Sequence, residues 1–149
     1  MVDVKKISDL SLLEGIPSEN LSLLAPLCEE IYVKAGDQLF CEGCEAEKLY
    51  ILLEGNITLS MKLTSRPENL VLGVINNYGQ CFGWSVIVAA NYYTASADAK
   101  EDSRILAING KDFKEFLKKD PETGFTIAMR MVEIVSSRLR YYRILIKTF

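Results

Sequence analysis

The chain contains no histidine, and this absence excludes a large part of enzyme chemistry. Imidazole bases, Ser-His-Asp and Cys-His nucleophiles and histidine-liganded metal sites all need that side chain. No run approaches 18 consecutive apolar residues, so we expect no membrane-spanning helix. Residues 1–9 lack the apolar core of a secretory signal. A non-catalytic role in sensing or binding is therefore the leading class of function.

Cysteine is also scarce, with four residues at positions 28, 41, 44 and 81. Without a secretory signal they indicate free thiols and a cytoplasmic location. Cys41 and Cys44 form a single C-x-x-C motif, whereas a structural zinc site needs a second pair, so we predict no metal site. We favour the interpretation that these cysteines are small residues placed in and around a strand, rather than a metal or redox site. A thiol-based sensor that uses Cys41 and Cys44 stays an alternative.

The residues that are present describe one ordinary domain over positions 1–149. They are 49% hydrophobic and 25% charged, which is typical of a chain that buries its own core. The net charge of −3 divides unevenly, because residues 125–149 carry +4 and residues 1–124 therefore carry −7. A solvated helix face near the C-terminal end of its dipole explains this basic segment. A patch that docks an acidic partner or the β-roll of a neighbouring subunit is the alternative.

The hydrophobic pattern predicts a mainly β fold with helices at both ends. Short helices are expected within residues 7–28, and strands separated by glycine turns are expected within residues 29–109. The expected strands are residues 31–33, 38–40, 49–53, 57–63, 70–75, 79–82, 92–99 and 104–108. Eight short strands in one segment indicate an antiparallel β-roll of the jelly-roll type.

Residues 111–149 change to a helical period. A first helix is expected at 111–119, and Asp120-Pro121 ends it before a long helix begins. The long helix carries an apolar seam with alternating spacings of three and four, formed by Phe125, Ala128, Val132, Val135, Leu139, Tyr142 and Ile146. So wide an apolar surface needs two partners, and we predict the β-roll and a second copy of the chain. Packing of the whole helix within one chain is the alternative.

Residues 79–97 combine Phe82-Gly83, an apolar stretch at 86–88 and small residues at 94–97. Glycine-marked hairpins precede them at 33–43 and 49–55. This arrangement resembles the phosphate-binding cassette of cyclic nucleotide-binding domains, the sensor domains of catabolite-activator and FNR-type regulators. The resemblance covers residues 7–149 and implies a β-roll followed by the family's B and C helices. It also implies a non-catalytic regulatory module.

Two positions depart from the family pattern. Trp84 stands where the family has a Glu that accepts a ribose hydrogen bond, and Tyr93 stands where it has an Arg that neutralises the phosphate. Losing a charged hydrogen bond of roughly 1.5–3 kcal/mol weakens binding on the order of 10- to 100-fold. We therefore expect weak or altered binding of cAMP, cGMP or another small planar ligand. The candidate cassette residues are Phe82, Gly83, Trp84, Ser85, Val86, Tyr93 and Thr94.

Two questions about this site stay open in the sequence. Trp84, Tyr92 and Tyr93 either plug the nucleotide site, which we favour, or line a site for a different planar ligand. On the long helix, Ser136 and Ser137 resemble the step with which catabolite-activator-type proteins contact adenine, which makes them candidate ligand contacts. The alternative is that both serines are polar residues tolerated within a helix.

The family's transcription factors add a helix-turn-helix after the long helix. The sequence ends at Phe149 without such a module, so we predict no DNA binding by this chain alone. A protein effector is an expected partner. The remaining alternative to a ligand sensor is a ligand-free dimeric interaction scaffold.

Overall fold

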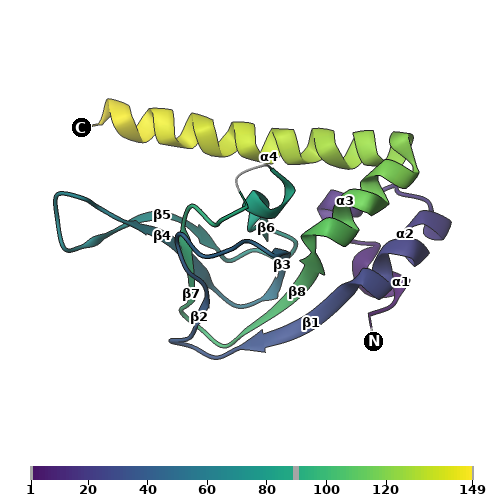
Figure 1. Cartoon of the computed structure of the whole chain (residues 1–149), viewed down its shortest axis with the longest axis horizontal. Coiled ribbons are helices and arrows are strands. Elements are labelled where there is room, and N and C mark those ends of the chain that lie inside the picture. Colours follow the sequence, from purple (N-terminus) through teal and green to yellow (C-terminus); the bar gives the residue numbers. More distant parts are fainter. Residues whose placement is uncertain (1, 89–90, 149) are drawn as a thin grey trace.

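The computed structural model describes residues 2–88 and 91–148 as a β-roll with helices at both ends (Figure 1). Residues 89 and 90 of the predicted cassette lie outside the described residues. The N-terminal elements are α1 (Val4–Ile7), the 3-10 helix η1 (Ser11–Leu13), α2 (Ser18–Leu24) and the 3-10 helix η2 (Ala25–Leu27). The short helices expected within residues 7–28 thus begin earlier, at Val4, and two of these four helices are 3-10 helices.

Within the described residues, eight strands form two antiparallel sheets of four strands each. The strands are β1 (Cys28–Val33), β2 (Gln38–Phe40), β3 (Lys48–Glu54), β4 (Ile57–Lys62), β5 (Asn69–Ile75), β6 (Cys81–Phe82), β7 (Ser96–Ala99) and β8 (Ser103–Asn109). The sheet orders are β1-β8-β3-β6 and β2-β7-β4-β5. The predicted eight-stranded antiparallel roll is confirmed.

Strand β3 shows why the continuous apolar run at 49–53 forms a central strand. Its side chains alternate between two buried clusters, because successive residues of a strand point to opposite faces of the sheet. Leu49 and Ile51 belong to the cluster under the helices, whereas Tyr50 and Leu52 belong to the cluster inside the roll. Both faces of this sheet are therefore covered, one by helices and one by the second sheet.

The two C-terminal helices are α3 (Gly110–Lys119) and α4 (Pro121–Lys147), joined at Asp120. Asp120 caps α4, and its carboxylate also accepts hydrogen bonds from Asn20 Nδ2 and Thr123 Oγ1, each at 2.8 Å. Gly124 lets the two helices approach closely, because a Cβ at this position would lie 2.1 Å from the Leu117 carbonyl oxygen. Figure 1 shows α4 running past the roll, above β6 and the 3-10 helix η3 (Trp84–Ile87).

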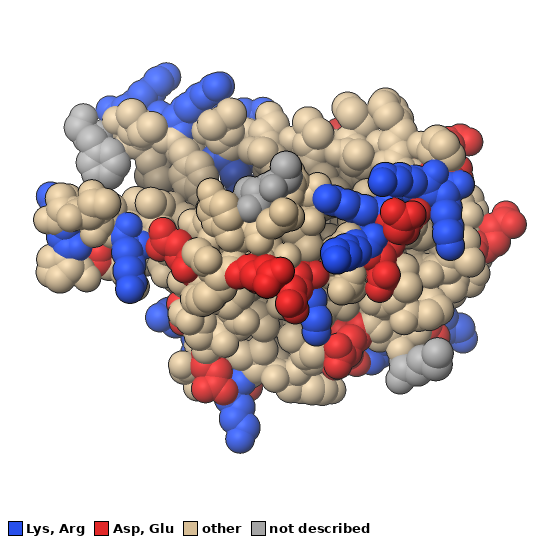
Figure 2. Space-filling view, viewed as in Figure 1, with Lys and Arg blue, Asp and Glu red and all other residues tan. Residues whose placement is uncertain are grey.

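The faces of α4 differ sharply in burial. Ile127 and Met131 are buried against the N-terminal and α3 elements, and Tyr142 is half-buried with its hydroxyl donating to the Leu72 carbonyl at 2.8 Å. The other residues of the predicted seam stay exposed in the single chain, namely Phe125, Ala128, Val132, Val135, Leu139 and Ile146. Figure 2 shows Lys and Arg side chains gathered over the C-terminal part of the same helix. In the part of the chain that the structure describes, no helix meets the length and hydropathy of a membrane span.

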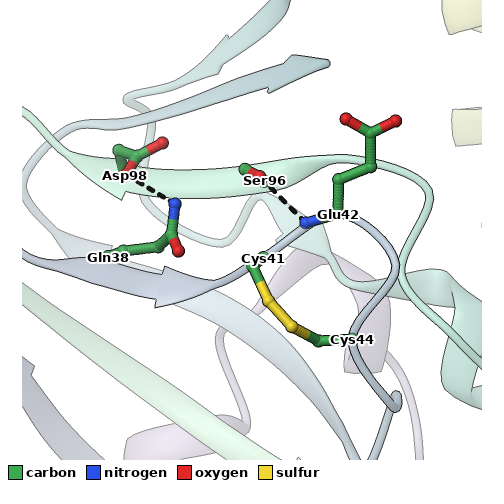
Figure 3. Close-up of a disulfide and its surroundings, with 6 residues drawn as sticks. All are labelled: Gln38, Cys41, Glu42, Cys44, Ser96 and Asp98. Atoms are coloured by element: carbon green, nitrogen blue, oxygen red, sulfur yellow. Dashed lines mark hydrogen bonds between the residues drawn. A yellow bond between two sulfur atoms is a disulfide. The ribbon is translucent and has the colours of Figure 1, made fainter. Parts of the chain in front are cut away.

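Cys41 and Cys44 are joined by a disulfide (Figure 3). The prediction of free thiols is therefore wrong for this pair, whereas Cys28 and Cys81 are free and buried. Gly43 provides the physical reason: its left-handed conformation (φ +83°) closes a tight turn in which the Cys44 N–H donates to the Cys41 carbonyl at 3.1 Å. The turn places the two Cα atoms 5.4 Å apart, within the range that a disulfide spans.

Candidate functional site

A cavity of about 360 Å³ lies between the cassette and α4. Its cassette side is formed by Gly83, Trp84, Ser85, Tyr93, Thr94 and Ala95. Phe40, Leu59 and Leu72 of the roll and Val135, Arg138, Leu139 and Tyr142 of α4 complete the lining. A concave, mainly apolar lining with a few polar groups is typical of a small-molecule site.

Gly83 sets the start of η3 at the cavity wall. Its φ of +81° is left-handed, and a Cβ would lie 3.1 Å from Tyr50 Cδ2 and 3.3 Å from the Lys48 carbonyl oxygen. A larger residue is therefore strained on both counts. Two other candidate residues support the cassette without lining the cavity: Phe82 is fully buried in the roll, and Val86 packs against the start of α3.

Tyr93 occupies the floor of the cavity with its polar end turned away. Its hydroxyl donates to the Lys48 carbonyl oxygen at 2.7 Å and accepts from the Lys48 N–H at 3.2 Å. Its ring stacks on Phe40 with the centroids 3.9 Å apart, and the residue is only 4% exposed. Tyr93 thus fills part of the interior with a satisfied hydroxyl, and the described residues of the cassette supply no cation to the adjoining cavity.

Trp84 forms the wall that faces α4. Its indole N–H is buried and finds no acceptor among the described residues. The guanidinium carbon of Arg138 lies 5.9 Å from the centre of the indole ring, within the range of a cation–π contact. The expected plug is therefore incomplete, because Trp84 and Tyr93 both border open volume.

Arg138 is the charged residue that the sequence analysis did not single out as a site residue. Its Nη2 donates to the Cys81 carbonyl at 3.2 Å, and no carboxylate of the described residues lies within 4.0 Å of it. Burial lowers the pKa of this guanidinium from its ordinary value. Among the described residues it is the one charged side chain that lines the cavity. The sequence does carry a signal for Arg138: the helical period places this charged residue on the same face of α4 as Ile127 and Met131, which are buried.

The two serines of α4 lie beside the cavity rather than in its wall. Ser136 and Ser137 are both exposed, and Ser137 lines a neighbouring hollow together with Arg138 and Tyr141. Their neighbours Val135 and Arg138 are the residues of this segment that border the main cavity. The 100° turn between successive helical residues separates the two sets.

Comparison with known proteins places this geometry in a family. Residues 30–120 match the family model described as a cyclic nucleotide-binding domain. A solved cyclic nucleotide-binding domain from Methylobacillus flagellatus superposes with a TM-score of 0.80 at 18% identity, over 98% of this chain and 82% of that chain. The regulatory subunit of a cAMP-independent protein kinase A from Trypanosoma cruzi, bound to guanosine, gives a TM-score of 0.77 at 19% identity, over 97% of this chain and 49% of that chain.

A curated relative supports the same assignment at the level of sequence. The anaerobic regulatory protein of Bacillus subtilis is 27% identical over 125 residues, which are 84% of this chain and 50% of that protein. The chain spans between 21% and 50% of the length of three curated relatives that it matches. The family match covers more than half of the chain, from β1 to the end of α3. The chain belongs to the cyclic nucleotide-binding domain family.

Proposed function

We propose that the chain is a regulatory module that binds a small planar ligand in the cavity between the cassette and α4. The observation that carries this proposal is the cavity of about 360 Å³ whose walls come from both elements. A ligand held there contacts residues of both elements, among them Trp84 of the cassette and Arg138 of α4. Ligand binding therefore changes which position of α4 relative to the roll has the lower free energy.

The shape of the lining supports a planar ligand. Trp84, Tyr93, Phe40 and Tyr142 present aromatic surface to the cavity. Aromatic rings bind flat partners by stacked or edge-to-face packing, which contributes about 0.5–1.5 kcal/mol for each pair beyond burial of area. The hydroxyls of Ser85 and Thr94 supply polar contacts at the same wall.

The charges of the lining support weak binding of a cyclic nucleotide. Arg138 lacks a carboxylate partner among the described residues and is therefore available to an anionic group. The lining residues that the structure describes include no carboxylate to accept a hydrogen bond from a ribose hydroxyl, and Trp84 stands where the resemblance expects the Glu. We expect cAMP and cGMP to bind with Arg138 as the charged contact in place of the family's Arg and Glu, roughly 10- to 100-fold more weakly than a site with both family contacts. The guanosine-bound relative from Trypanosoma cruzi supports testing an uncharged nucleoside as well.

The output of the module is proposed to pass through α4. This helix lines the cavity with Val135 and Leu139, and the same two side chains, which belong to the seam, are 50% and 48% exposed in the single chain. A homodimer formed through the exposed seam would bring two such helices together. A shift of α4 on ligand binding then changes how the two subunits pack against each other, or the surface that α4 offers to a protein effector. The cytoplasmic location and the absence of catalysis stay predictions from the sequence.

Calorimetry with three probes, cAMP, cGMP and guanosine, tests this proposal. We expect saturable heat with at least one probe and a weaker signal from Trp84→Ala, which removes an aromatic wall. The matched control is Tyr32→Ala, because Tyr32 is 76% exposed and lies outside this cavity. Absence of heat from all three probes at high micromolar concentration contradicts the proposal.

A ligand-free dimeric scaffold is the second candidate function. The buried ring and satisfied hydroxyl of Tyr93 favour it, because they fill part of the interior without a ligand. A stable dimer that gives no heat with the three probes would support this second function.

A further inference from the structure

The disulfide turn lies directly behind the floor of the ligand cavity. A second hollow of about 450 Å³ is lined by Cys41 and Cys44, and it shares Phe40 and Tyr93 with the ligand cavity. The stacked rings of Phe40 and Tyr93 therefore form a wall common to the two hollows. Phe40 also directly precedes Cys41 in the chain.

Backbone hydrogen bonds fasten the turn to Tyr93 from both sides. The Gly43 N–H donates to the Tyr93 carbonyl at 2.8 Å, and the Tyr93 N–H donates to the Cys44 carbonyl at 2.9 Å. The Glu42 N–H extends the contact to Ser96 Oγ at 2.9 Å (Figure 3). The position of Tyr93 thus depends on the conformation of residues 41–44.

The two cysteines of the turn are also the accessible ones. Cys44 is exposed and Cys41 is half-buried, whereas Cys28 and Cys81 are buried in the core. Burial raises the pKa of Cys28 to about 12 and also raises the pKa of Cys81, which keeps both as unreactive thiols. An oxidant or a reductant in solution therefore reaches the Cys41–Cys44 pair first.

We propose that Cys41 and Cys44 form a reversible thiol–disulfide site whose redox state sets the position of Tyr93 and thereby the ligand affinity of the cavity. The effect on affinity rests on the proposed function of that cavity. Because the loop between the two cysteines is only two residues long, the disulfide constrains the unfolded chain little and is a poor general staple. Its effect is local, on the turn that holds Tyr93.

The redox step needs a peroxide in one direction and a dithiol in the other. One thiolate attacks the peroxide O–O bond, becomes a sulfenic acid and releases water after proton transfer. The thiol of the other cysteine then attacks the sulfenic sulfur, forms the S–S bond and releases a second water. Together the two thiols lose two electrons, which reduce the peroxide. A dithiol reductant reverses the step by exchange. Its first thiolate attacks one sulfur of the disulfide and releases the other cysteine as a thiolate, and its second thiolate then attacks the mixed disulfide, releases the remaining cysteine and closes the reductant's own disulfide.

The single tryptophan of the chain makes the proposal testable without a ligand. Trp84 lines the same cavity as Tyr93, so its emission reports a change in the wall that Tyr93 forms. The experiment compares peroxide-treated and dithiol-treated protein, with accessible thiols counted by alkylation and mass spectrometry. The Cys41→Ser, Cys44→Ser double variant is the control, and circular dichroism verifies that it folds.

We expect the wild-type protein to gain a Cys41–Cys44 disulfide with peroxide and to change its Trp84 emission reversibly, whereas the double variant shows no change. Calorimetry on the two redox forms should then differ by roughly 5- to 150-fold in affinity for whichever of cAMP, cGMP or guanosine binds. Failure to form the disulfide, identical emission from both forms, or equal affinity in both forms would overturn the proposal. An emission change without binding of any probe supports the coupling of the turn to the cavity and contradicts the proposed function alone.

Discussion

The guanidinium carbon of Arg138 lies 5.9 Å from the centre of the Trp84 ring and joins α4 to the cassette. A cation–π contact of this kind contributes about 0.5–2 kcal/mol, depending on its exposure. The resemblance described above puts Trp84 where the family has a carboxylate, which predicts that this contact is a departure from the usual site. A ligand that enters the cavity competes with the contact or adds to it.

Replacing Arg138 by Gln should lower the affinity for cAMP or cGMP about 10- to 100-fold, because the cavity loses its charged donor. The affinity for guanosine should change less, since guanosine carries no phosphate. Calorimetry on the wild type and the variant measures both effects. Arg140→Gln is the matched control, because Arg140 is exposed on the same helix and does not line the cavity. Equal losses for the charged and uncharged probes would contradict the role assigned to Arg138.

Substituting Ala for Gly110 should destabilise the fold by about 1–3 kcal/mol, the usual range for overpacking. The added Cβ would lie 1.8 Å from Val86 Cγ2, and a branched side chain at that distance cannot move aside easily. Urea denaturation measures the free energy of unfolding. The control is Gly73→Ala, where a Cβ meets no atom within 4 Å. Similar stability of the two variants would show that η3 and α3 do not pack as described.

Introducing a carboxylate at Val132 should convert the proposed dimer into a monomer. Val132 is 57% exposed on the seam of α4, and an unpaired charge buried in an apolar helix interface is costly. Sedimentation velocity on Val132→Asp measures the change in mass. Arg140→Asp is the control, because it adds the same group on the same helix outside the seam. A wild-type protein that sediments as a monomer would remove the dimer from the proposal.

Asp120 should make the stability depend on pH. Hydrogen bonds from Thr123 and Asn20 hold the pKa of its carboxyl below the ordinary value of 3.8. Because the folded-state pKa is the lower one, the stabilisation is fully present above about pH 3.8 and is lost as the pH falls through the folded-state value. Asp120→Asn should therefore melt at a lower temperature than the wild type at pH 7, and the two curves should converge in acid. A constant difference between the melting temperatures down to about pH 2 would contradict this assignment.

The sequence predicts the roll well because its signals are local. The short apolar run at 49–53 and glycine turns such as Gly55 indicate strands without knowledge of their partners. The expected strand at 92–99 is the exception, since β7 begins only at Ser96 and Tyr92 makes an isolated bridge with Glu45. The backbone of residues 91–93 is bonded instead to the segment around the disulfide turn, a long-range partner that periodicity does not reveal.

The site is less predictable because it depends on how α4 meets the roll. The seam residues of α4 are recognisable from their spacing. The rotation of α4 about its own axis, which brings Arg138 to the cavity and leaves Ser136 exposed, is set by the packing of Ile127 and Met131. The Cys41–Cys44 bond depends in the same way on the left-handed turn at Gly43. Residue types identify candidates, and tertiary packing decides which of them share a wall.

The most direct test of the central claim is the emission of Trp84 during titration with cAMP, cGMP and guanosine, because this single tryptophan lines the cavity. We predict a saturable change in emission with at least one probe, reached at a lower concentration in the wild type than in Arg138→Gln when that probe carries a phosphate. Unchanged emission with all three probes up to high micromolar concentration would contradict the claim that this cavity is a ligand site.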